Sequence, residues 1–252
     1  MRALQRTLLP AAALLAAFCV AAPASAQPRG AGGPPRTARQ AAPVDLTGQW
    51  VSIVTEDWRF RMVTPPKGDI PGVNLTPAGA AIANAWDPAK DAAAGDQCKA
   101  FGAAGIMRIP GRLRISWKDD QTLQIEADAG EQTRLLHFAA MPDGEPSLQG
   151  TSRAKWIPYG GGRGQAPVGG ALEVITTNMK EGYLRRNGVP YSTQTVLTEH
   201  LDVLQEPDGS TWLVVQTLVE DPVYHTGVIL SSSNFRKQKD RSGWDPAPCA
   251  ER

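Results

Sequence analysis

The densest group of charged side chains near the start of the sequence lies at residues 56–61, which read EDWRFR. Its aromatic residues are typical of a β-strand, and we predict a strand over 58–63. Alternate residues of a strand share one face, so Asp57, Arg59 and Arg61 would point to the same side. If that side faced a barrel interior, Asp57 and Arg59 would bind a carboxylate or polar head group, because a guanidinium is a forked donor. The alternative is a half-exposed strand with solvated charges.

Residues 182–192, GYLRRNGVPYS, form a second group of hydrogen-bond donors and aromatic rings. They surround an Asn-Gly pair, which is typical of a tight turn. Loops at a barrel mouth carry function more often than the strands that hold them, and arginine and tyrosine are favoured where a ligand or partner binds. We therefore predict ligand contacts here, the alternative being a turn that only connects strands. The predicted contacts are Tyr183, Arg185 and Tyr191, with Arg186 beside them.

Three histidines, His137, His200 and His225, lie on or near predicted strands. Three imidazoles around an open coordination position would suit zinc or iron. The sequence has no H-x-H, HExxH or CxxC spacing, so we expect no metal and no other cofactor.

Acid–base catalysis without a cofactor has its own candidates. His200, Asp202 and His225 carry the groups that such chemistry needs, and Glu199 and Asp221 lie close to them in the sequence. On a strand, His200 and Asp202 would share one face while Glu199 shares the other face with leucines, and the sequence leaves open which face looks inward. A G-x-S-x-G elbow and a dinucleotide-binding loop are both missing.

One short helix is predicted between Thr76 and Gly95. A threonine followed by a proline gives a capping hydroxyl and a first-turn proline, which together start a helix. The Asp-Pro pair at 87–88 is expected to break this helix, which then resumes through Ala94 until glycine stops it.

Most of the remaining sequence alternates between apolar and polar residues with the period of a β-strand. Such a number of strands cannot stay one flat sheet without exposed edges. We expect a mainly β fold, an antiparallel lipocalin-like barrel of about ten strands whose interior holds a small ligand, with a β-sandwich as the alternative. The predicted strands are 49–55, 58–63, 112–118, 123–128, 132–138, 148–156, 171–178, 195–204, 211–219 and 228–235.

The first residues have the layout of a secretory signal. Two arginines precede an apolar stretch at 8–22, and Ala24-Ser25-Ala26 is a small-x-small cleavage site. The stretch is shorter than the 18 or more residues that a membrane span needs, so we expect cleavage rather than a retained anchor, and no transmembrane segment afterwards. The expected location is the periplasm or the exterior. The expected parts are a signal peptide at 1–26, a disordered Pro/Gly/Arg-rich leader at 27–43 and a single barrel domain at 44–252.

Cys98 and Cys249 are the two cysteines outside the predicted signal. An even pair in an oxidising compartment predicts a disulfide, with two unpaired buried thiols as the alternative. A loop of this length would contribute roughly 4–5 kcal/mol in the chain-entropy model.

The formal net charge is +1, and it becomes −1 once the two arginines of the signal are removed. A near-neutral domain lacks the basic surface that nucleic acids require, so we expect no nucleic-acid partner.

Several stretches between Asp45 and Cys249 resemble a family of uncharacterised exported bacterial proteins. The resemblance implies a single exported β-rich domain, and it brings no activity, ligand or catalytic residue with it. The stretches are LTGQWVSIVTEDWRFRMVTPPKGD, AWDPAKD, QCKAFGAAGIMRIPGRL, TTNMKEGYLRRNGVPYS, VEDPVY and GWDPAPC.

These observations favour an exported protein that binds a small, partly apolar molecule. One alternative is a cofactor-independent lyase, isomerase or hydrolase with its site in the barrel. Another is an accessory module of the cell envelope that presents residues 182–192 to another protein. Catalysis predicts a carboxylate and a histidine that meet in a cavity, whereas an accessory module predicts a filled interior and an exposed aromatic patch.

Overall fold

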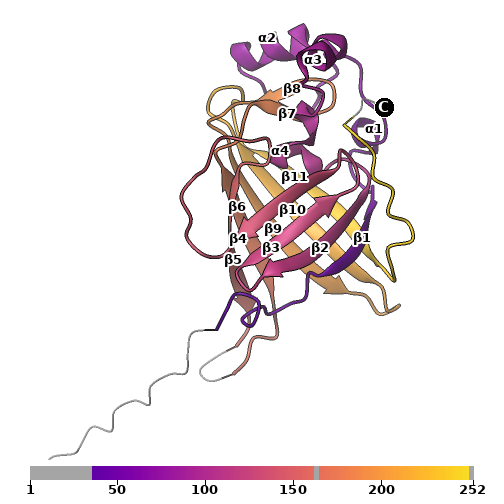
Figure 1. Cartoon of the computed structure of the whole chain (residues 1–252). Helices are drawn as coiled ribbons and strands as arrows, with labels where there is room; N and C mark the ends of the chain where they lie inside the picture. Colours follow the sequence, from indigo (N-terminus) through magenta and orange to yellow (C-terminus); the bar gives the residue numbers. More distant parts are fainter. Residues whose placement is uncertain (1–35, 162–164, 250–252) are drawn as a thin grey trace, which may run out of the picture. The chain divides into compact units, whose positions relative to one another are not determined.

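The computed structural model of the chain describes residues 36–161 and 165–249. Within them, nine strands close into a barrel in the order β1-β11-β10-β9-β6-β5-β4-β3-β2, in which β1 pairs with β2 (Figure 1). The prediction of a mainly β barrel of about ten strands is confirmed. The barrel strands are β1 Gly48–Ile53, β2 Arg112–Asp119, β3 Thr122–Ala127, β4 Gln132–His137, β5 Thr151–Tyr159, β6 Gly169–Thr177, β9 Val196–Gln205, β10 Thr211–Glu220 and β11 Ile229–Gln238.

One pair of neighbours departs from the antiparallel pattern. Strands β4 and β5 run parallel, with Leu136 opposite Ser152 and His137 opposite Arg153. Parallel neighbours require a long crossover, and residues 138–150 provide it by returning the chain along the outside of the barrel. The barrel is therefore mixed rather than purely antiparallel.

The inward side chains alternate along every barrel strand, as the apolar pattern of the sequence requires. A barrel of about this size leaves an interior that side chains can fill, and most of this interior is a packed hydrophobic cluster. Its members, each at most 4% exposed, include Trp50, Leu113, Ile115, Leu123, Ile125, Leu136, Leu172, Val174, Leu201, Leu213, Val215 and Phe235.

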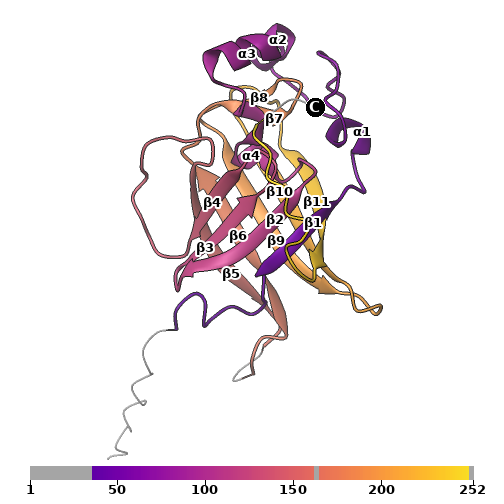
Figure 2. The ribbon, with the colours of Figure 1, turned by 45° about the vertical axis from the view of Figure 1, so that its right-hand side comes forward.

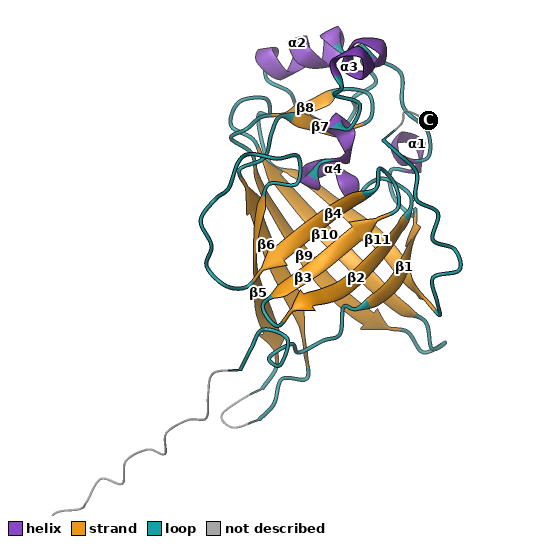
Figure 3. Ribbon diagram, viewed as in Figure 1, coloured by secondary structure: helices purple, strands orange, loops and turns teal. Residues whose placement is uncertain are grey.

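Short helices and a hairpin cover one end of this barrel, and we call them the cap (Figure 3). They come from two connections, one between β1 and β2 and one between β6 and β9. The same arrangement is visible after a 45° turn (Figure 2). The cap consists of α1 Trp58–Arg61, α2 Pro77–Ala85, α3 Pro88–Ala94, η1 Lys99–Phe101, α4 Ala103–Ile106, β7 Gly182–Arg185 and β8 Val189–Tyr191.

The predicted helix between Thr76 and Gly95 is present as α2 and α3. Thr76 Oγ1 accepts a hydrogen bond from Gly79 N at 3.2 Å, and Asp87 caps α3 after the expected break. Gly95 ends α3 with a φ of 78°, in the left-handed region where glycine has no steric penalty. The expectation of a single short helix was wrong, since the cap also holds α1, α4 and η1.

The strand predicted over 58–63 was wrong as well. The chain leaves the barrel after Ile53, and Asp57 then adopts φ 49°, after which Trp58–Arg61 forms one helical turn. Aromatic residues favour strands only where a neighbouring strand can pair with them. No strand in the described part of the chain pairs with 58–63, so the shared face inferred for Asp57, Arg59 and Arg61 does not exist.

Part of the predicted leader is in contact with the barrel. Ala38 is 8% exposed, and its carbonyl accepts a hydrogen bond from Trp156 Nε1 at 2.9 Å. Arg39 N donates to Asp120 O at 3.1 Å. Residues 36–43 therefore contact the barrel. The predicted signal peptide and residues 27–35 of the predicted leader lie outside the described residues, and the predicted division of the chain stays a prediction.

The predicted disulfide between Cys98 and Cys249 is confirmed, with the two Cα atoms 5.1 Å apart. It joins the cap to the C-terminal segment, which runs along the barrel and contacts the β3–β4 turn through Gly130 N and Ala247 O at 2.8 Å. No helix in residues 36–161 or 165–249 is long and apolar enough to cross a membrane.

Candidate functional site

Three of the six predicted ligand contacts meet in the cap. Asp57 precedes α1, Arg61 ends α1, and Arg185 belongs to β7. Arg186 Nη2 donates a hydrogen bond to Arg61 O at 2.8 Å, across a separation of 125 residues in the sequence. The two polar groups of the sequence thus form one arginine-rich region between the cap and the barrel.

A hollow of about 190 Å³ opens at this place, and we call it the mouth pocket. Cap residues form one side of it, and the rims of β10 and β11 form the other. Its polar atoms come from Asp57, Arg108, Arg185 and Ser231, and the rest of its wall is mostly apolar. The apolar wall consists of Pro71, Gly72, Val73, Ala104, Leu184, Val219, Ile229 and Leu230.

Arg108, which the sequence analysis missed, is part of this wall. It follows α4, and its Nη2 lies 2.9 Å from Asp57 Oδ2. Its side chain is 13% exposed, compared with 44% for that of Asp57. A lone arginine in the apolar run GIMRIPG gives no sequence signal for binding, because only the fold brings it opposite a carboxylate.

Arg61 is the most deeply buried arginine of the region, with 2% exposure. Its Nε donates to Arg108 O at 2.8 Å, but its Nη1 and Nη2 atoms have no hydrogen-bond partner. It lines a recess of about 10 Å³, the Arg61 recess, which shares Arg108, Leu184 and Arg185 with the mouth pocket. This recess has room for about one oxygen atom.

The electrostatics of the region reflect crowded guanidinium groups. Burial, together with the neighbouring Arg108, lowers the pKa of Arg61 to about 10, against the opposing effects of Glu56 and Asp57. Burial also lowers the pKa of Arg185, and again Arg108 adds to the effect. In both arginines burial is the larger cause, and repulsion from Arg108 acts in the same direction.

The other three predicted contacts line neither the mouth pocket nor the Arg61 recess. Arg59 Nη2 lies 2.6 Å from Asp69 Oδ2 with most of its side chain in solvent. Tyr183 Oη donates to Asp91 at 2.9 Å. Tyr191, the last residue of β8, is fully buried, and burial raises the pKa of its phenol.

The structure separates the predicted catalytic residues. His200 and Asp202 lie on the outward face of β9, where Asp202 accepts a hydrogen bond from Tyr159 Oη at 2.5 Å. His225 is 5% exposed and its Nε2 lies 2.8 Å from Pro190 O. Asp221 beside it is used structurally: burial acts to raise its pKa, but hydrogen bonds from backbone and hydroxyl groups outweigh burial and lower it.

Those hydrogen bonds attach the turn after β10 to the chain that leads into β9. Asp221 Oδ2 accepts from Thr195 Oγ1 at 2.8 Å and from Ser192 N, and Oδ1 accepts from Val223 N at 2.8 Å and Tyr224 N at 3.0 Å. A carboxylate with this many donors is held ionised and fixed. Its arrangement suits a structural anchor better than proton transfer.

A polar band crosses the inner face of four neighbouring strands just below the cap. Arg134 on β4 and Glu199 on β9 form a bidentate ion pair, with Nη1–Oε1 at 3.1 Å and Nη2–Oε2 at 2.6 Å. Ser152 and Thr176 lie on the strands between them, and Arg134 Nη2 also donates to Thr176 Oγ1. The pair is 2% and 1% exposed. The sequence signal for this pair is that each charged residue shares its strand face with leucines, Arg134 with Leu136 and Glu199 with Leu197 and Leu201.

No group of three or more His, Cys, Asp or Glu side chains in the described part of the chain could hold a metal ion. His137 and His200 face outward from different strands, and His225 lies in the turn between β10 and β11. The three histidines are therefore not brought together.

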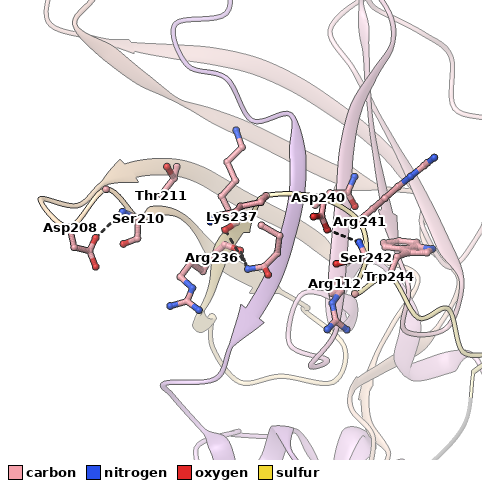
Figure 4. A pocket seen from close by; sticks show the side chains of 15 residues that line it. Arg112, Asp208, Ser210, Thr211, Arg236, Lys237, Asp240, Arg241, Ser242 and Trp244 are labelled. Carbon is pink, nitrogen blue, oxygen red and sulfur yellow. Dashed lines mark hydrogen bonds between the residues drawn. The ribbon is translucent and has the colours of Figure 1, made fainter.

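A larger hollow, of about 770 Å³, is on the outer surface beside the ends of β10 and β11 (Figure 4). Each of its two carboxylates accepts a hydrogen bond within its own turn: Asp208 accepts from Ser210 N and Asp240 accepts from Ser242 N, both at 2.8 Å. The labelled side chains in Figure 4 spread over separate segments rather than converging on one point. The mouth pocket, although smaller, is the better candidate site.

Comparisons of the chain with protein-family models, with curated proteins and with solved structures find no match.

Proposed function

We propose that this is an exported protein, periplasmic or secreted, that binds a small, partly apolar molecule in the mouth pocket. The observation that carries the proposal is the composition of this pocket, which combines an apolar wall with Arg108, Arg185 and Asp57. Small-molecule sites are typically concave and apolar with a few polar groups that orient the ligand. The Cys98–Cys249 disulfide is compatible with an oxidising compartment.

The packed interior supports a ligand at the mouth rather than deep in the barrel. The hydrophobic cluster fills the interior, and the buried Arg134–Glu199 pair occupies part of the same inner face. Residues at the rim, by contrast, leave the 190 Å³ hollow between β11 and the cap. The proposal therefore keeps the predicted class of ligand and moves it from the interior to the mouth.

The alternatives have less support. Acid–base catalysis would need a carboxylate and a histidine that meet in a cavity, whereas His200 and Asp202 face outward and His225 contacts a backbone carbonyl. An accessory module would need residues 182–192 to be available to a partner. Most of that segment is buried, including every residue from 186 to 192.

The test is native mass spectrometry of the mature protein purified from the periplasm, followed by denaturation and identification of any organic molecule released. Ser231→Phe would fill the mouth pocket, because Ser231 lines it. Ser232→Phe is the matched control on the opposite face of β11. We expect a bound molecule in the parent protein and in Ser232→Phe, and its loss in Ser231→Phe. A molecule retained equally by both variants would place the binding site elsewhere.

A further inference from the structure

We propose that the ligand of the mouth pocket is an organic acid, and that its acidic group binds Arg61 and Arg185 where the pocket meets the Arg61 recess. This inference rests on the proposed function and adds the chemical class of the ligand. Its basis is that the buried Arg61 has two terminal nitrogens without a hydrogen-bond partner. Neither the composition of the mouth pocket nor the sequence patterns explain this.

A buried guanidinium without partners is costly. The two terminal nitrogens of Arg61 lie out of solvent and have no acceptor in the described part of the chain. Its one hydrogen bond, from Nε to the carbonyl of Arg108, does not supply a negative charge. Buried ions are normally paired and hydrogen-bonded, so this geometry calls for an anionic oxygen beside Arg61.

The resident carboxylates are already engaged. Asp57 is bound to Arg108, and Asp69 is bound to Arg59. Arg185 donates to Pro71 O at 3.0 Å and has no carboxylate within 4.0 Å in the part of the chain that the structure describes. An incoming anion would therefore find two guanidinium groups, those of Arg61 and Arg185, that form no ion pair within 4.0 Å in the described residues. Glu56 and Asp57 act on Arg61 only from farther away.

The shape of the hollows defines the rest of the ligand. The Arg61 recess accepts about one oxygen atom, and the adjoining mouth pocket offers about 190 Å³ with apolar walls. An inorganic anion would leave that apolar wall unfilled. A small acid with a hydrocarbon body would satisfy both hollows, with its oxygens toward the arginines and its body against Val73, Leu184 and Ile229.

The experiment is isothermal titration calorimetry of the mature protein with hexanoate and benzoate, each paired with its neutral amide, and with inorganic phosphate. Three variants accompany the parent protein. Arg61→Met removes the charge and keeps an apolar side chain of similar length. Asp57→Asn removes the resident carboxylate beside the pocket, and Lys90→Gln is the control, since this exposed cap lysine lines neither hollow.

We expect the acids to bind at least tenfold more tightly than their amides. Arg61→Met should weaken acid binding at least tenfold and leave amide binding unchanged. Asp57→Asn should strengthen acid binding, because one negative charge near the site is gone, and Lys90→Gln should change nothing. The increase with Asp57→Asn keeps the test decisive even if Arg61→Met fails to fold.

The failures are distinguishable. If the amides bind as tightly as the acids, or if Asp57→Asn weakens acid binding, the organic-acid inference is wrong and the proposed function stands. If phosphate binds as tightly as the acids and depends equally on Arg61, the site is a general oxyanion site and the inference is again wrong. If no acid or amide binds and no molecule is released from the purified protein, the proposed function itself fails.

Discussion

Removing one partner of the Arg134–Glu199 pair should destabilise the barrel strongly. Both side chains are at most 2% exposed, and their two hydrogen bonds measure 3.1 and 2.6 Å. In Glu199→Gln the guanidinium of Arg134 stays buried without its counterion. Breaking a buried pair in this way costs about 3–5 kcal/mol of the free energy of unfolding.

The double variant Arg134→Met/Glu199→Leu provides the contrast. It removes both charges together, and the surrounding leucines and valines can pack against the new side chains. Replacement of a buried pair by apolar residues of similar volume is often neutral or stabilising. We therefore expect the double variant to be more stable than either Glu199→Gln or Arg134→Met alone.

Urea unfolding at pH 7, followed by tryptophan fluorescence, measures all four free energies in the oxidised protein. The residual cost of the double variant comes from Thr176 Oγ1, which loses a donor at 3.3 Å. A normal hydrogen bond of this kind contributes about 1 kcal/mol. If the losses in the free energy of unfolding of the single variants add up, the double variant will be the least stable of all. That result would refute the description of this pair as two mutually dependent buried charges.

Three further outcomes are expected. Replacing Cys98 and Cys249 by serine should lower the free energy of unfolding by about 5 kcal/mol in the chain-entropy model, measured by urea unfolding, because the closed loop spans 151 residues. Asp221→Asn should destabilise the protein at pH 7, and the effect should shrink progressively as the pH is lowered below about 4, measured by thermal unfolding. Since its folded pKa is lowered, the carboxylate contributes stability above its unfolded pKa near about 4, and this is lost as pH falls through the folded value. Gly188→Ala should destabilise by more than about 1 kcal/mol and alter the near-ultraviolet circular dichroism of Trp86, because φ is 83° and a Cβ would collide with that ring.

The barrel was predictable because its strands carry a local signal. Leu113 and Ile115 alternate with arginines on β2, and each barrel strand repeats some version of this pattern. What the pattern leaves open is the direction of each face. Glu199 and Arg134 share their faces with leucines, yet the sequence does not reveal that they meet, because β5 and β6 lie between their strands.

The errors arose where the chain leaves the sheet. Residues 58–63 have strand-forming side chains but no neighbouring strand, so local propensity lost to tertiary context. Residues 36–43 have the composition of a disordered spacer, yet hydrogen bonds from Trp156 Nε1 to Ala38 O and from Arg39 N to Asp120 O help to hold them on the barrel. Neither result follows from composition, because each depends on which other segments of the folded chain are next to these residues.

The candidate site shows the same division between local and long-range information. Each arginine group was visible in the sequence, but their meeting depends on two insertions that leave the barrel at one end, between β1 and β2 and between β6 and β9. The contact of Arg186 with Arg61 O joins these insertions. Because the barrel below is closed and packed, changes within the two insertions would alter the mouth pocket without altering the strands that support it. Specificity in this fold would therefore be determined by the cap, and the unpaired donors of Arg61 indicate where that specificity lies.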